Sequence, residues 1–217
     1  MILIENNPKS IAAESYRTLR TNIQYSSFDN PVKSIVITSA EPGEGKSTTS
    51  INLALSFAQD NKRTIIIDCD LRKPIIHKEF GISNSKGLTE FLLGKEDFSN
   101  VVYKHKSGLH VLPSGLIPPN PAEMLASRAM EHLLGQLEER YDYIILDTSP
   151  VNAVADSKIL STKVDGTVLV VKYGYTKKDV VIEAVKGLKA VKSNIIGTVF
   201  NGEEKSKGKY YYYYKKN

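Results

Sequence analysis

A glycine-rich turn between an apolar run and a helical pattern is the feature that most constrains the fold of this 217-residue chain. Residues 34–38 read as a short buried strand, residues 39–48 (SAEPGEGKST) form the turn, and residues 50–58 repeat apolar side chains at helical spacing. In such a turn Gly43 and Gly45 let successive backbone N–H groups point at an anion, and the start of the following helix adds its positive dipole end. The segment therefore predicts a site for the phosphates of ATP or GTP.

Two side chains of this turn bring the chemistry that phosphate binding requires. Lys46 supplies a mobile positive charge for the β- and γ-phosphates, and the Ser47 hydroxyl is placed to ligate Mg²⁺. The strict pattern begins with glycine, and Ala40 stands at that position here. The predicted nucleotide-binding residues of the turn are Gly43, Glu44, Gly45, Lys46, Ser47 and Thr48.

Apolar runs recur along the chain, separated mostly by helical patterns. They fall at residues 34–38, 64–67, 109–112, 143–146, 167–171 and 195–200. Continuous Val- and Ile-rich runs that alternate with helices are typical of a parallel sheet with both faces covered. We therefore expect an α/β fold of three layers, in which helices lie on both faces of a mostly parallel central β-sheet.

The N-terminal segment reads as an amphipathic helix. The helical pattern covers residues 11–24, within a segment of about residues 8–26, and places Ile11, Leu19 and Ile23 on a related face. A helix with one apolar face is expected to pack against the body of the domain.

The composition changes near the C-terminus. After residue 202 it turns polar and then abruptly aromatic, so we expect residues 1–202 to form the folded domain and residues 203–217 a flexible tail. That tail carries five Lys and two Glu, and so holds +3 of the chain's net charge of +5. A solvated, disordered end is the simplest interpretation, and contact with anionic lipid or nucleic acid is the alternative.

Several classes of protein are disfavoured by composition. A single cysteine, Cys69, excludes an internal disulfide framework and suits a reducing cytosol. The four histidines have no zinc-like spacing with that cysteine: His77, His105, His110 and His132. The N-terminus does not resemble a signal peptide, and no apolar run approaches the roughly 20 residues of a membrane span. Any membrane role is therefore expected to come through a partner.

Two of the predicted strands end in carboxylates. Asp68 and Asp70 follow residues 65–67, and Asp147 follows residues 144–146. In open α/β sheets the ligand lies at the carboxyl ends of the strands, so these side chains are expected beside the phosphates. One carboxylate would order the hydration shell of Mg²⁺, and another would accept a proton from an incoming hydroxyl. The alternative is an ordinary turn at a strand end, with Arg72 as a surface ion pair.

Taken together, these motifs resemble the bacterial tyrosine kinases, P-loop enzymes that act with polysaccharide co-polymerase adaptors in capsule and exopolysaccharide synthesis. Residues 65–72 (IIIDCDLR) match the family's pattern of three apolar residues and D-x-D-x-R. Residues 144–150 (IILDTSP) match its pattern of three apolar residues and D-x-x-P. The resemblance extends over nearly the whole chain and includes residues 118–125 (PPNPAEML), residues 155–156 and the tyrosine-rich tail. It implies a P-loop NTPase fold and an ATP- and Mg²⁺-dependent kinase.

The resemblance also implies roles for individual residues. The implied catalytic residues are Lys46, Asp68, Asp70 and Asp147, and the implied metal site consists of Ser47, Asp68 and Asp147. Either Asp68 or Asp70 would be the general base for a tyrosine hydroxyl, and the sequence does not choose between them. Asn201 is similar to the residue that contacts the adenine base in related ATPases, although a polar residue at a strand end also has an ordinary turn interpretation.

An E-x-x-R-x-x-R pattern lies in the N-terminal helix, at Glu14, Arg17 and Arg20. Spacings of three place these side chains along one helical face, where a solvated row of ion pairs contributes about 0.3–0.5 kcal/mol per pair. In the family this pattern lies at the subunit interface of a closed ring. The resemblance therefore implies a homo-oligomeric ring, an octamer in the unphosphorylated state, in which each tail reaches a neighbouring active site.

Five consecutive tyrosines occupy the tail: Tyr210, Tyr211, Tyr212, Tyr213 and Tyr214. No helix or strand uses such a run efficiently, and an adhesive or β-aggregating segment is one interpretation. In a kinase the run reads as the autophosphorylation site. Each phosphotyrosine adds a charge of about −1.5 to −2, so three would reverse the charge of the tail, and we expect the ring to loosen.

The family implies further partners: the cytosolic tail of a separate transmembrane adaptor, a cognate tyrosine phosphatase, and other protein substrates, with no nucleic acid. It implies a cytoplasmic protein held at the inner face of the membrane through the adaptor. The main alternative is a MinD/ParA-like ATPase switch without kinase activity. Such switches carry a signature lysine early in the loop, where this chain has Glu41, and the tyrosine tail also favours a kinase.

Overall fold

The computed structural model describes residues 2–26 and 31–202. Residues 1, 27–30 and 203–217 lie outside this description, and the five predicted acceptor tyrosines are among them. The predicted boundary near residue 202, with a flexible tail after it, therefore stays a prediction.

The described part is built on a seven-stranded sheet with the order β3-β4-β2-β5-β1-β6-β7. The strands are β1 (Ser34–Ser39), β2 (Thr64–Asp68), β3 (Tyr103–Lys104), β4 (His110–Leu112), β5 (Tyr143–Asp147), β6 (Gly166–Lys172) and β7 (Ile195–Asn201). Each neighbouring pair is parallel except β3 and β4, which are antiparallel. The predicted mostly parallel sheet is confirmed, and β3 is an addition that the apolar pattern did not indicate.

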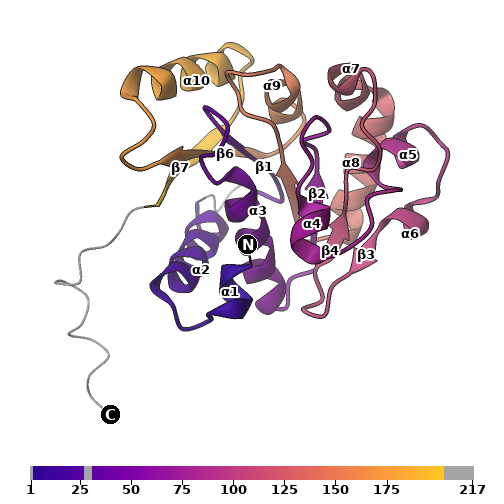
Figure 1. Ribbon diagram of the computed structural model, residues 1–217, viewed down its shortest axis with the longest axis horizontal. Helices are drawn as coiled ribbons and strands as arrows, with labels where there is room; N and C mark the ends of the chain where they lie inside the picture. The colour runs from indigo at the N-terminus through magenta and orange to yellow at the C-terminus, as the bar shows by residue number, and fades with distance from the viewer. Residues whose placement is uncertain (1, 27–30, 203–217) are drawn as a thin grey trace.

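Helices cover both faces of the sheet (Figure 1). They are α1 (Leu3–Asn6), α2 (Ile11–Gln24), α3 (Lys46–Gln59), α4 (Ile76–Phe80), α5 (Leu88–Leu92), α6 (Phe98–Val101), α7 (Pro121–Ala126), α8 (Arg128–Arg140), α9 (Asp156–Ser161) and α10 (Lys178–Ala190). The apolar side chains of α1 to α4 join one core layer, and those of α5 to α10 join the other face. The three-layer architecture is thus confirmed.

Alternation along the central strands decides which side chains meet which helices. Ile35 and Ile37 of β1 pack with α3, whereas Val36 packs on the opposite face, as the two-residue period of a strand requires. By the same alternation, the side chains of Ile66 and Ile145 lie on the face of the sheet that α3 covers. The residues two positions further along β2 and β5 are the aspartates that end these strands. Their side chains are therefore directed to the side of the sheet that α3 covers.

The edges of the fold differ from the expectation in two respects. Helix α2 begins after Ser10, whose hydroxyl accepts a hydrogen bond from Ala13 N, and Ile11 is 60% exposed rather than part of the apolar face. Strand β7 lies at the sheet edge, and much of it is exposed, including Phe200. Among residues 2–26 and 31–202, none of the helices has the length and apolarity needed to cross a bilayer.

Candidate active site

The predicted phosphate-binding turn joins β1 to the first turn of α3. Gly43 and Gly45 have φ angles of +80° and +93°, a region that residues with a Cβ rarely adopt. Lys46 begins the 14-residue helix, and Ser47 and Thr48 follow in its first turn. The free N–H groups and the positive dipole end of α3 therefore face the space above the turn, which is the arrangement that binds phosphate.

The Lys46 ammonium lies among the carboxylates of the neighbouring strands. Its Nζ is 2.9 Å from Asp70 Oδ2, 3.7 Å from Asp147 Oδ2 and 3.2 Å from Ser47 Oγ. Burial lowers the pKa of Lys46, but the charges of Asp147 and Asp70 together outweigh it, so the pKa lies above its usual value. Lysine, serine and two carboxylates thus converge as the sequence predicted. In this state, however, the lysine is engaged by the acids.

Asp68 is held mainly by backbone donors. Its Oδ2 accepts hydrogen bonds from Ile75 N and Ile76 N, both at 3.0 Å, and its Oδ1 accepts one from Asp70 N at 3.3 Å. The side chain is fully buried. Burial and the charge of Asp147 raise the pKa of Asp68 from 3.8 to about 8, although these hydrogen bonds and Lys46 act in the opposite direction. Asp68 therefore fixes the start of α4 as well as lying in the acidic cluster.

Asp147 has one oxygen held and one without a hydrogen bond. Ser50 Oγ on α3 donates to its Oδ1 at 3.0 Å, whereas Oδ2 is buried and, within the described residues, has no hydrogen-bond partner. Burial raises the pKa of this carboxyl. A buried oxygen without a donor is costly, and a hydrated cation beside it would satisfy it. The donor set of Ser47, Asp68 and Asp147 therefore fits Mg²⁺.

That fit does not depend on a protein-only metal cage. In the described residues, no group of three His, Cys, Asp or Glu side chains is arranged to hold a metal ion by itself. Mg²⁺ in nucleotide sites keeps several waters and takes ligands from the phosphates as well as from one or two side chains. The site is thus suited to a magnesium ion that arrives with a nucleotide.

Asn201 lies against the phosphate-binding turn although it ends the last strand. Its Nδ2 donates to Glu44 O at 2.9 Å, and a Cβ on Gly45 would lie only 1.9 Å from the same nitrogen. The Glu44 side chain is buried and accepts hydrogen bonds from Thr176 Oγ1 and from Glu41 N. The turn is therefore fixed from the side of β6 and β7, by Thr176 and Asn201.

A buried group near the site was not among the predicted site residues. Asp156, at the start of α9, accepts two hydrogen bonds from the Arg72 guanidinium, and Ser149 Oγ lies 3.3 Å from its Oδ2. Arg72 is thus paired with a buried acid instead of forming a surface pair. The sequence offered one signal, because the segment around Asp156 shares the family resemblance. A partner 84 residues away is not visible in the spacing.

The predicted interface residues do not all face outward. Arg17 pairs with the exposed Glu14 at 3.0 Å and also donates to Pro8 O. Arg20 instead turns inward, where its Nη1 donates to Ser56 O at 2.7 Å and its Nη2 lies 3.6 Å from Asp60 Oδ1. Glu14 and Arg17 thus remain available for an interface, whereas Arg20 attaches α2 to α3.

Comparison with known proteins gives a consistent result. Residues 32–196 match the family model of an AAA domain. The tyrosine-protein kinase YwqD of Bacillus subtilis (strain 168) is 46% identical over 98% of this chain and 90% of its own length. The putative tyrosine-protein kinase CapB of Staphylococcus aureus is 35% identical over 98% and 94%. Among solved structures, the chimerical protein CapA2B2 is 38% identical with a TM-score of 0.91, and the match covers 94% of this chain and 90% of that one.

Proposed function

The chain belongs to the bacterial tyrosine-protein kinases, and we propose that it transfers the γ-phosphoryl group of ATP to its own tyrosines 210–214. The observation that carries this proposal is the convergence of Lys46, Asp70 and Asp147 within 4 Å at the first turn of α3. Residues 1–202 form the kinase domain and residues 203–217 carry the acceptors.

Nucleotide binding requires Lys46 to change partner. The triphosphate binds at the N-terminal end of α3. Lys46 then leaves Asp70 Oδ2 and contacts the β- and γ-phosphates. Mg²⁺ bound by Ser47, Asp68 and Asp147 would neutralise the charge that develops on the phosphate oxygens. Asn201 lies on the side of the turn where the adenine base would bind.

Release of Lys46 also exposes a base. Asp70 Oδ1 accepts a hydrogen bond from Lys73 N, whereas Oδ2 is held only by Lys46 among the described residues. Both oxygens of Asp68 are engaged by backbone N–H groups. We therefore assign the base to Asp70, because geometry is the first requirement for proton transfer. As the tyrosine oxygen bonds to the γ-phosphorus, the bond to ADP breaks and the phenolic proton passes to Asp70.

We also propose a wider setting for the reaction, which membership of the family supports. The acceptors react in trans within a ring-shaped homo-oligomer, an octamer before phosphorylation, with Glu14 and Arg17 of α2 at the subunit interface. A transmembrane polysaccharide co-polymerase adaptor contributes its cytosolic tail, holds the kinase at the inner face of the membrane and stimulates it. A tyrosine phosphatase reverses the reaction. The cycle regulates the synthesis and export of capsular or extracellular polysaccharide.

The test is incubation of the full chain with Mg-ATP, with and without the cytosolic tail of an adaptor, followed by phosphotyrosine mapping. We expect phosphate on residues 210–214, none in Lys46→Met, and none when the five tyrosines are replaced by Phe. ATP hydrolysis without phosphotyrosine under any condition would favour the ATPase switch over the kinase. Assembly mass before and after the reaction tests whether phosphorylation loosens the ring.

A further inference from the structure

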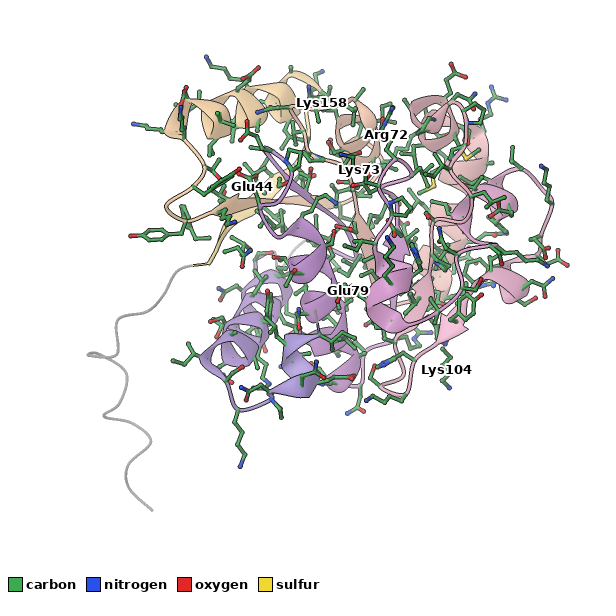
Figure 2. The ribbon with its side chains drawn as sticks, in the orientation of Figure 1. Glu44, Arg72, Lys73, Glu79, Lys104 and Lys158 are labelled. Atoms are coloured by element: carbon green, nitrogen blue, oxygen red, sulfur yellow. The ribbon has the colours of Figure 1, made fainter. Side chains whose placement is uncertain are left out.

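Arg72 and Asp156 form a two-point ion pair at the edge of the active site. Arg72 Nε donates to Asp156 Oδ2 at 2.8 Å, and Nη2 donates to Oδ1 at 3.2 Å. The Asp156 side chain is 0% exposed, whereas that of Arg72 is 41% exposed. Figure 2 shows Arg72 and Lys73 near each other in the upper middle of the molecule, with Glu44 to their left. The guanidinium is therefore fixed at its inner edge and open at its outer one.

The pair connects two segments that each carry a carboxylate of the site. Arg72 lies two residues after Asp70, in the segment between β2 and α4. Asp156 begins α9, after the segment that leaves β5 at Asp147. Hydrogen bonds to Asp156 raise the pKa of Arg72, and the charges of Asp156 and Asp70 add to this. Arg72 is thus an electrostatic neighbour of the cluster around Lys46.

Stability alone is a poor explanation for this arrangement. A buried carboxylate loses its hydration, and an apolar pair of similar size often serves the fold equally well. What the two-point contact supplies is orientation, because the planar guanidinium can be held in only one plane by a bidentate carboxylate. Within the described residues, Nη1 has no hydrogen bond or ion pair, so one donor group of Arg72 is uncommitted.

We propose that Asp156 is a positioning residue for phosphoryl transfer, which holds Arg72 so that its uncommitted edge meets the negative charge of the γ-phosphoryl group as it is transferred. This inference rests on the proposed kinase function. Arg72 is then a catalytic residue supplied within the same subunit, and Asp156 acts through it. Ser149 adds a third contact on the carboxylate of Asp156 and keeps it in place.

A second Arg–Asp pair, at the amino ends of β2 and β5, serves as a control. Arg63 immediately precedes β2 and Asp142 immediately precedes β5, and they form a pair of the same type, with Nη2 to Oδ1 at 2.7 Å and Nε to Oδ2 at 3.4 Å. This second pair lies at the amino ends of the strands, at the opposite edge of the sheet from the phosphate-binding turn. Asp142→Asn therefore removes a two-point contact of the same type, here between more exposed side chains, without touching the site.

The experiment measures autophosphorylation and ATP binding for the wild type, Asp156→Asn, Arg72→Lys, the double variant and Asp142→Asn. We expect kcat to fall about 30-fold in Asp156→Asn while KM for ATP stays within about threefold, because misplacement of a group acts on the transfer step. Asp142→Asn should keep its kcat within about twofold. The double variant should be no slower than Arg72→Lys, because Asp156 has nothing left to position.

The outcomes separate this inference from the kinase proposal. A wild type without phosphotyrosine would count against the kinase proposal itself. An active wild type with unchanged kcat in Asp156→Asn, or with losses that simply add in the double variant, would overturn the role of Asp156. If thermal unfolding shows that Asp156→Asn does not fold, Ser149→Ala serves instead: it should lower kcat with KM preserved, and no change would overturn the inference.

Discussion

Asp68 and Asp147 are direct register partners on the parallel strands β2 and β5. Their side chains are directed to the same face, beneath the first turn of α3, and both are fully buried. Two carboxylates so placed are strongly disfavoured from both being ionised unless a cation lies nearby, and Lys46 is the cation beside them.

The buried Asp68 should make the stability of the protein depend on pH. Because the pKa of Asp68 is about 8 in the folded protein and about 3.8 when unfolded, the folded state binds this proton more tightly. The contribution of this proton to the free energy of unfolding is complete below pH 3.8 and is lost as the pH rises through 8. The free energy of unfolding without ligand should therefore fall as the pH rises from 6 to 8, and the fall should level off above pH 8. Urea unfolding should show a shallower slope for Asp68→Asn, and parallel curves would contradict this account.

Removal of the cation should cost stability as well as activity. Lys46→Met leaves Asp70 and Asp147 buried without their partner, which typically costs about 3–5 kcal/mol. The loss should be larger at pH 8 than at pH 6, because the neighbouring Asp68, whose pKa is about 8, carries more negative charge at the higher pH. Lys73→Met, which removes an exposed charge from the neighbouring segment, is the control and should unfold like the wild type. Urea unfolding at the two pH values checks both variants.

The two glycines of the turn should differ in their sensitivity. Both have a positive φ, so alanine adds strain of about 1–3 kcal/mol at either position. A Cβ on Gly43 meets nothing within 4 Å, whereas one on Gly45 collides with Asn201. Titration with a fluorescent ATP analogue should show at least about tenfold weaker binding in Gly45→Ala than in Gly43→Ala. Asn201→Ala should restore part of that difference, and equal losses would show that the contact is unimportant.

The three charged residues of α2 should have two different roles, one in stability and one in assembly. Arg20→Ala removes hydrogen bonds to α3 and leaves Ser56 O without this donor, which should cost about 1–3 kcal/mol in any assembly state. Glu14→Ala with Arg17→Ala removes an exposed and a half-buried side chain, and it should have a smaller effect on unfolding than Arg20→Ala while reducing assembly mass. Sedimentation measures the mass, and an intact assembly in the double variant would exclude this face as the interface.

Much of the fold followed from local patterns. Val- and Ile-rich runs gave six strands within a few residues, because buried parallel strands have little freedom in composition. The short elements were not predicted. Strand β3 has two residues, and α4 is a single turn whose start depends on hydrogen bonds from its backbone to Asp68. Such elements are fixed by tertiary contacts rather than by their own propensity.

The site was predictable where it depends on chain order and less so where it depends on packing. The glycine turn and the strand-end aspartates lie together because the carboxyl ends of parallel strands meet. The spacing of Arg20 indicated only a helical face, and its inward direction depends on where α3 lies. Asp156 could not be paired with Arg72 before the segments after β2 and β5 were placed side by side.

The contact of Asn201 with Glu44 sets a length limit on the assembly. The strand that leads to the proposed acceptor tyrosines ends against the phosphate-binding turn, so the segment that would carry them to a neighbour starts beside its own site. Tyr210 follows Asn201 by nine residues and Tyr214 by thirteen. At about 3.6 Å per residue their Cα atoms reach at most about 32 Å and about 47 Å from it. A ring whose neighbouring sites are further apart than the shorter reach can phosphorylate only the distal tyrosines, so subunit spacing would decide which acceptors react.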